Sequence, residues 1–304
     1  MKIALILLIL AVPCAAGAQV TPEATSLFGK PLVSVPPSGE TKIRLDSDLA
    51  KAKADYDRDP ASADAAIWLG RRLAYLGRYR DAIDAFTQGI ARHPVEARLY
   101  RHRGHRYITI RKFDLAIADL KKASQLVAGK KDEIEPDGAP NKAGIPRSTL
   151  QSNIWYHLGL AQYLSGDFTS ALASYREGMN VSRVNDDMLV ATSDWLYMTL
   201  RRLKRDTEAR TVLEPIREQM DVLENGAYHA RLLMYKGLRT PESVLNLNTA
   251  DDIQIATQGY GVGNWHLVNG DRVKAKEVFD RVLAGKAWTA FGFIAAEADV
   301  KRGF

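Results

Sequence analysis

Residues 67–90 read IWLGRRLAYLGRYRDAIDAFTQGI, and residues 101–124, which start 34 positions later, read RHRGHRYITIRKFDLAIADLKKAS. The two stretches carry small or large apolar side chains at matching positions, as in the pairs Gly70 and Gly104, Ala82 and Ala116, and Phe86 and Leu120. A fixed period of this length is typical of stacked helical units, each too small to bury its apolar face alone. The sequence therefore predicts an all-α repeat fold.

The same signature returns further along the chain, as Gly159 with Ala171 and as Gly263 with Ala275. Two helices that pack closely need small side chains where their backbones approach, with large ones beside them. The fourth unit keeps the spacing but loses the glycines, and the fifth is recognisable only as helices. The predicted solenoid spans 41–304, with a cap helix at 41–59, repeats near 63–96, 97–130, 152–185, 190–223, 225–249 (degenerate) and 256–287, and a cap helix at 288–302.

One repeat combines Leu69-Gly70, the turn glycine Gly77, an aromatic at Tyr79, and then Ala82, Phe86 and Pro94. On its 34-residue period, this pattern resembles the tetratricopeptide repeat family, in an exported bacterial form. The resemblance implies a right-handed α-solenoid whose concave face is lined by the first helix of each repeat and binds peptides or proteins. It implies no reaction and no cofactor.

The N-terminus has the pattern of a secretory signal peptide. Met1-Lys2 is followed by the apolar run 3–12, and Ala16-Gly17-Ala18 supplies small residues for cleavage after residue 18. The run is too short to span a bilayer, and no later run is long enough. We predict a signal peptide at 1–18, a periplasmic or secreted protein, and a proline-containing extended linker at 19–40. The one cysteine, Cys14, lies inside the signal and lacks the usual setting of a lipid anchor.

Basic residues gather on the first helix of the second unit. The chain has 42 Lys and Arg against 36 Asp and Glu, and no acidic residue occurs between Arg98 and Lys112. If this helix lines a groove, its guanidinium groups would bind carboxylates of an acidic protein or peptide. A solvated face with buried side-chain stems is the alternative, and nucleic acid is not expected for an exported protein. The candidate groove residues are Arg71, Arg98, Arg101, His105 and Tyr156.

An insertion at 131–151 separates the second and third repeats, which otherwise stay in phase. It contains the acidic run Asp132-Glu133-Ile134-Glu135-Pro136-Asp137. One hypothesis is that these carboxylates fold back onto the Arg98–Arg106 face and occupy the groove. The other is a solvated loop.

Signals for an enzyme are weak. His102 and His105 lie three apart, but they stand among arginines and have no carboxylate or thiol nearby in sequence, so we predict no metal site. The glycines at 259, 261 and 263 lack the strand and the lysine of a phosphate loop. We predict no catalytic residue and a protein-binding adaptor. A self-associating scaffold subunit of an envelope assembly is the alternative, and an enzyme with an unrecognised site is a third.

Overall fold

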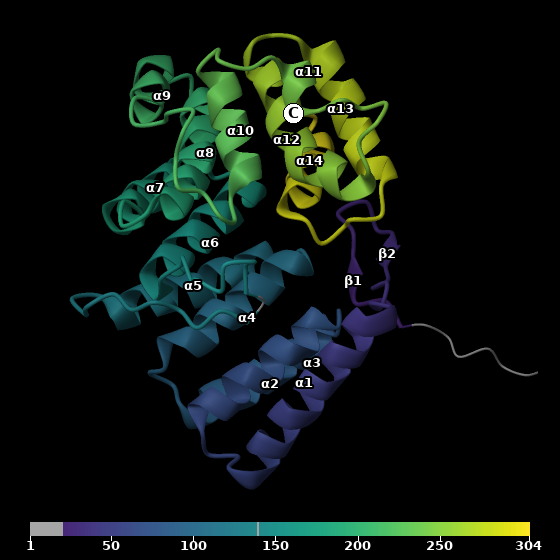
Figure 1. Cartoon of the computed structure of the whole chain (residues 1–304), viewed down its shortest axis with the longest axis vertical. Coiled ribbons are helices and arrows are strands. Elements are labelled where there is room, and N and C mark those ends of the chain that lie inside the picture. The colour runs from purple at the N-terminus through teal and green to yellow at the C-terminus, as the bar shows by residue number, and fades with distance from the viewer. Residues whose placement is uncertain (1–20, 139) are drawn as a thin grey trace, which may run out of the picture.

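Antiparallel pairs of helices follow one another along the chain and stack side by side (Figure 1). This arrangement comes from a computed structural model, which describes residues 21–138 and 140–304. Strand structure in this part of the chain is limited to one two-stranded hairpin. The all-α repeat fold predicted from the sequence is confirmed. The predicted signal segment lies outside the described residues.

The N-terminal half of the array is regular. Each pair turns through a short loop, with a glycine of positive φ at Gly77 and Gly166. The helices are α1 (Gly39–Arg58), α2 (Ala63–Tyr75), α3 (Tyr79–Arg92), α4 (Ala97–Thr109), α5 (Phe113–Val127), α6 (Leu150–Ser165) and α7 (Phe168–Ser182).

The C-terminal half is less regular, because two of its helices are short. Pro215 follows closely on α9, and proline lacks the N–H that a longer helix would need. The helices are α8 (Asp186–Arg202), α9 (Asp206–Val212), α10 (Gly226–Tyr235), α11 (Pro241–Val244), α12 (Asp252–Val268), α13 (Arg272–Ala284) and α14 (Phe291–Arg302). No helix in the described part of the chain combines the length and the apolar character that crossing a bilayer requires.

One contact recurs in every well-preserved pair. A glycine on the first helix faces a large side chain on the second helix, 16 positions later in the chain. A Cβ added at Gly70 would lie 2.3 Å from the Phe86 ring. The other pairs that share this contact are Gly104 with Leu120, Gly159 with Tyr175, and Gly263 with Phe279. These glycines set the distance between the paired helices.

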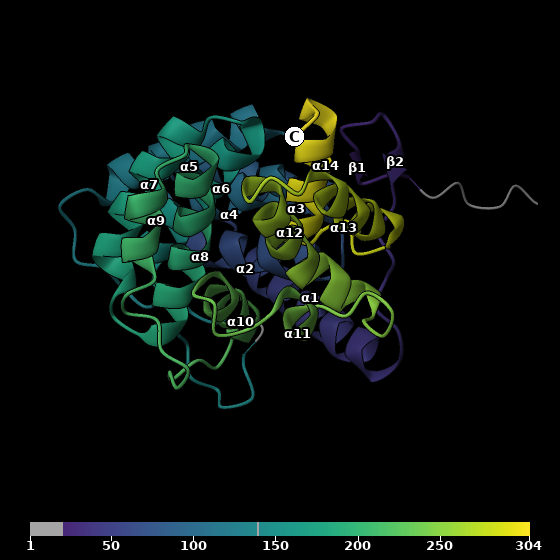
Figure 2. The ribbon, with the colours of Figure 1, turned by 90° about the horizontal axis from the view of Figure 1, so that it is seen from above.

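The array curls back on itself, so that its later first helices pack together instead of lining an open groove. Helix α12 contacts α8 and α13, and α14 contacts both α12 and α6 (Figure 2). The rings of Tyr163, Trp195 and Tyr260 meet at this centre, with Trp195 and Tyr260 stacked at 5.8 Å between centroids. The concave surface from α6 onward is therefore filled by the chain's own core.

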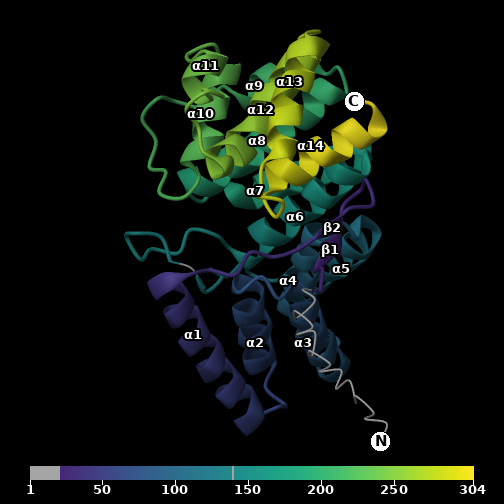
Figure 3. The same cartoon turned by 90° about the vertical axis from the view of Figure 1, so that its right-hand side faces the viewer.

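The N-terminal segment is not the extended tether that its prolines predict. Strands β1 (Ala24–Thr25) and β2 (Pro31–Leu32) pair antiparallel, and this hairpin lies against α14 (Figure 3). The Leu27 N–H donates to Glu297 at 2.6 Å, and Trp288 Nε1 donates to the carbonyl of Val33 at 2.9 Å. Proline spacing predicted an extended chain, but it carried no information about this distant docking surface.

Glu297, on the C-terminal helix α14, also connects this helix to the second repeat. This carboxylate is 1% exposed and accepts a hydrogen bond from Arg111 Nε at 2.9 Å. Arg111 has a φ of +64° in the turn between α4 and α5, and its Nη2 donates to the carbonyl of Trp288. Removing one partner of such a buried ion pair would leave an unpaired buried charge and strongly destabilise the protein. The turn of the second repeat and helix α14 are thereby fixed against each other.

We expect the substitution Gly159→Ala to destabilise the protein. The added Cβ would lie 2.7 Å from the Tyr175 ring, which is fully buried and has no room to move. Overpacking of this kind lowers the free energy of unfolding by about 1–3 kcal/mol, against a helix-propensity gain of at most about 1 kcal/mol. Chemical denaturation measures the difference.

Gly226→Ala is the matched control, because a Cβ at Gly226 meets nothing within 4 Å. It should leave stability unchanged or raise it slightly. Equal effects of the two substitutions would contradict the proposed role of the glycine contact.

Candidate functional site

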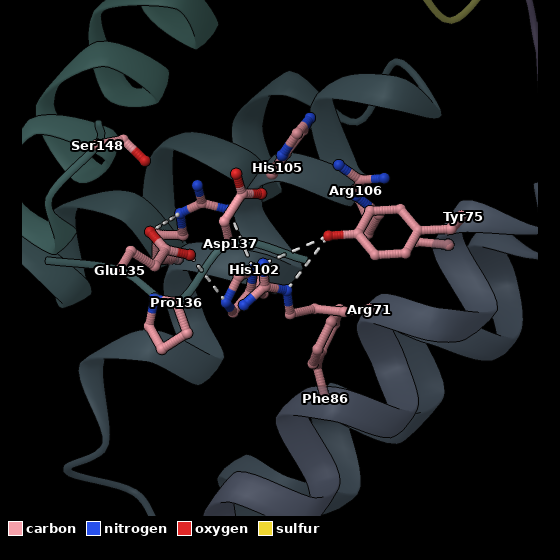
Figure 4. A pocket seen from close by; sticks show the side chains of 12 residues that line it. Arg71, Tyr75, Phe86, His102, His105, Arg106, Glu135, Pro136, Asp137 and Ser148 are labelled. Carbon is pink, nitrogen blue, oxygen red and sulfur yellow. Dashed lines mark hydrogen bonds and ion pairs between the residues drawn. The ribbon is translucent and has the colours of Figure 1, made fainter. Parts of the chain in front are cut away.

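A cavity of about 200 Å³ remains open on the concave side, between α2, α4 and the 131–149 loop (Figure 4). It lies at the N-terminal end of the array, and its His105 is next to Phe291 of α14. Its lining is rich in arginine and histidine and consists of Arg71, Ala74, Tyr75, Phe86, Arg101, His102, His105, Arg106, Glu135, Pro136, Asp137 and Ser148.

The inserted loop brings two carboxylates to this site, those of Glu135 and Asp137. Its two ends run antiparallel, with an isolated bridge between Ile134 and Thr149. The Glu135 N–H donates to the carbonyl of Ser148 at 3.0 Å, and the Leu150 N–H donates to the carbonyl of Glu133 at 2.8 Å. These bonds fix the backbone on both sides of Glu135 and direct its side chain toward α4.

The Glu135 carboxylate is buried among three polar groups. Its Oε2 lies 3.1 Å from Arg101 Nε, an ion pair whose atoms are not aligned for a hydrogen bond. Asn153 Nδ2 on α6 donates to the same oxygen at 2.7 Å, and His102 Nε2 lies 3.1 Å from Oε1. Three groups from two helices therefore hold one acidic side chain of the loop.

Electrostatics favour a charged Glu135 beside a neutral His102. Burial alone would raise the pKa of Glu135, but the Arg101 charge and the His102 contact outweigh it and hold this pKa below its usual range. Burial, with a further contribution from Arg101, lowers the pKa of His102 to about 3. Arg101 Nη1 donates to His102 Nδ1 at 3.0 Å, so the remaining proton of the neutral ring belongs on Nε2, where it donates to Glu135.

Two further guanidinium groups border the cavity. Arg71 lies 4.4 Å from the Trp68 ring centroid, and its Nη2 donates to the Tyr75 hydroxyl at 3.3 Å. Arg106 lies over the Tyr79 ring at 5.7 Å, and burial lowers its pKa to about 10. Arg106 therefore remains charged at neutral pH.

The cavity has an excess of positive charge. Three guanidinium groups line it together with two carboxylates, those of Glu135 and Asp137. The histidines add no charge at neutral pH, because burial also lowers the pKa of His105 well below its usual value. A partly enclosed site with one unbalanced positive charge attracts a singly charged anion.

The structure brings together three of the five residues predicted for the groove. Arg71, Arg101 and His105 all line the cavity. Arg98 does not, because its guanidinium turns away to Glu96 and to Asp64, at 2.8 and 2.6 Å.

Tyr156 also lies outside the cavity, which corrects its predicted place in an open groove. Its hydroxyl accepts a hydrogen bond from Trp195 Nε1 at 2.9 Å and lies 2.6 Å from the Tyr228 hydroxyl. The Phe291 ring of α14 lies 6.3 Å from Tyr156 and 5.3 Å from His105. The side chain of a C-terminal helix therefore stands where an open groove was expected.

Sequence reasoning did not select several cavity residues. Tyr75 lies one helical turn after Arg71, so the i, i+4 spacing could have placed it on the same face. Arg106 follows His105 directly and was noted only as part of the basic run. Ser148 carried no signal, because only the pairing of the loop ends brings it to the cavity.

Comparisons with known proteins give similarity at the level of structure. No protein-family model matches the sequence, and a search of the curated proteins finds no match. The crystal structure of MamA protein has 16% identity and a TM-score of 0.44, covering 66% of this chain and 88% of its own. YrrB, described as a TPR protein with an unusual peptide-binding site, has 13% identity and a TM-score of 0.42, covering 77% and 91%.

A structure of PilF from Pseudomonas aeruginosa has 14% identity and a TM-score of 0.46, covering 80% of this chain and 85% of its own. Identities and scores at this level do not bear on function. The repeat architecture rests instead on this chain's own helical pairs and their recurring glycine contact. These pairs confirm the all-helical repeat fold that the sequence predicts.

The free energy of unfolding should fall as the pH drops below about 6.5, because the folded protein keeps the buried side chains of His102, His105 and His157 neutral. Burial lowers the pKa of His157 to about 3, whereas an unfolded chain takes up the proton near 6.5. Unfolding therefore binds protons between these values, and each such histidine lowers the free energy of unfolding by about 1.4 kcal/mol per pH unit. Above pH 6.5 this effect is absent.

Denaturation measured from neutral pH to about pH 5, above the range where Glu135 titrates, checks this slope. The variant His157→Phe should have a smaller slope than the wild type. Tyr156→Phe is the neighbouring control, since burial raises the pKa of Tyr156 and its hydroxyl does not titrate in this window. An unchanged slope in His157→Phe would show that His157 is protonated in the fold.

Proposed function

We propose that this protein is an exported, non-catalytic binding module that holds an acidic segment of a partner protein at the cavity between α2 and α4. The observation that carries the proposal is the unbalanced positive charge of a partly enclosed site on the concave side of a helical-repeat scaffold. Stacked helices keep the binding groups at fixed separations, so little ordering is needed when a ligand binds.

The lining chemistry favours a carboxylate on an apolar stem. Arg71 and Arg106 supply guanidinium donors, which form charge-assisted hydrogen bonds with carboxylates. Ala74, Phe86 and Pro136 add apolar surface to the same cavity, suited to the methylenes of a glutamate side chain. A volume of about 200 Å³ admits one side chain, while the rest of a bound segment would extend along the concave face.

The wild-type protein should bind a short glutamate-rich peptide, and Arg71→Ala should weaken this binding. Loss of one charge-assisted contact corresponds to about 1.5–3 kcal/mol, or roughly a tenfold to hundredfold rise in Kd. Isothermal titration calorimetry at low salt measures the affinity.

Two controls define the result. The same peptide with glutamine in place of glutamate should not bind, and Arg176→Ala, on the exposed face of α7, should bind as the wild type does. Equal affinity for the glutamate and glutamine peptides would overturn the proposed acidic specificity.

Export gives a separate prediction. We propose cleavage after Ala18, so that the mature protein begins at Gln19 and contains no cysteine. When the full chain is produced in a bacterial host, intact mass spectrometry of the envelope fraction should find the chain without residues 1–18. A full-length chain confined to the cytoplasm would contradict export.

A further inference from the structure

The inserted loop passes over the concave side as a short acidic segment. Residues 135–138 read Glu-Pro-Asp-Gly, and the first three of them line the cavity directly (Figure 4). They face Arg101 and His102 on α4, and Arg71 and Tyr75 on α2. The segment therefore has the charge, and occupies the place, that a partner's acidic segment would have.

The contact with α2 is close and made by the backbone. Arg72 Nη1 donates to the carbonyl of Gly138 at 3.0 Å. Gly138 is buried, and a Cβ added there would lie 2.2 Å from the Tyr75 hydroxyl oxygen and 2.7 Å from Arg71 Nη2. A side chain at this position would have to push the Tyr75 hydroxyl and the Arg71 guanidinium aside.

The loop is also held at its other end. Asn141 Nδ2 donates to Glu224 at 2.6 Å, Asn185 Nδ2 donates to the carbonyl of Arg147, and Arg147 pairs with Asp221 at 2.6 Å. These contacts keep the loop near the groove when its middle leaves α2. A tethered segment has an effective concentration in the millimolar range, so it competes well with a free ligand.

We infer that Glu135–Gly138 is an intramolecular ligand of the cavity between α2 and α4. An acidic partner must then displace Pro136–Gly138 from α2 in order to bind there. The inference rests on the proposed function and names its regulation. Glu135 stays anchored on α4 and α6, while the contact of Gly138 with Arg72, Arg71 and Tyr75 is exchanged. If the internal segment fills the groove nine-tenths of the time, the apparent affinity for a partner is about tenfold below its intrinsic value.

The variant Gly138→Leu tests the inference, because its side chain displaces the ends of Tyr75 and Arg71 from their contact with the loop. Ala143→Leu is the control, with the same side chain at an exposed position of the same loop. The probes are the glutamate-rich peptide and a synthetic peptide of residues 131–138, both measured by calorimetry. We expect Gly138→Leu to bind both peptides about tenfold more tightly than the wild type and Ala143→Leu do.

A second variant guards against a folding defect. Arg72→Ala removes the bond to the Gly138 carbonyl without adding volume, and it should also raise the affinity; thermal melts establish that each variant is folded. Equal affinity of the glutamate-rich peptide for all variants would overturn the inference and leave the proposed function intact. Binding of the 131–138 peptide alone would support self-occupancy and overturn the proposed partner. No binding of either peptide to any folded variant would overturn both.

Discussion

The contact between a glycine and a large side chain 16 positions later is the constraint on which the fold depends. It sets the distance within a helical pair, and a fixed distance lets successive pairs stack with the same geometry. The residue type is fixed only on the first helix, which carries glycine in each well-preserved pair. The large side chain on the second helix varies, and can be Phe86, Leu120 or Tyr175. This asymmetry makes the repeat visible in a single sequence.

The glycine rule also explains where sequence reasoning stops. The helices of residues 63–130 can be predicted because each has one apolar face and one polar face. Helix α8 differs, because it is buried along almost its whole length. The spacing of its apolar residues predicts a helix, but it does not predict that the polar side chains on the other face are covered too. Its partners α12 and α14 come from distant positions, and nothing local in the sequence predicts that they would meet over the concave surface.

In the candidate site, too, some features could be predicted from the repeat and others depend on contacts between distant segments. Periodicity placed Arg71, Arg101 and His105 on first helices, and these three do share a cavity. The position of Phe291 beside His105 depends on closure of the array by the buried Arg111–Glu297 pair. That pair requires a left-handed φ at Arg111, a residue type that gives no signal of this conformation. The fold was therefore predictable from repetition, while the extent of the open groove was not.

The arrangement at Glu135 shows why the acidic loop is more than a solvated insertion. Three arginines and two histidines line the same cavity, and without compensation they would destabilise the fold through repulsion and desolvation. The fold avoids this by keeping His102 neutral and by bringing Glu135 from the loop to Arg101. Once Arg101 is neutralised, Arg71 and Arg106 remain as the basic groups facing the cavity, beside Asp137 of the same loop. A single inserted segment thereby compensates the charge of the first helices and sets how much positive charge remains at the cavity.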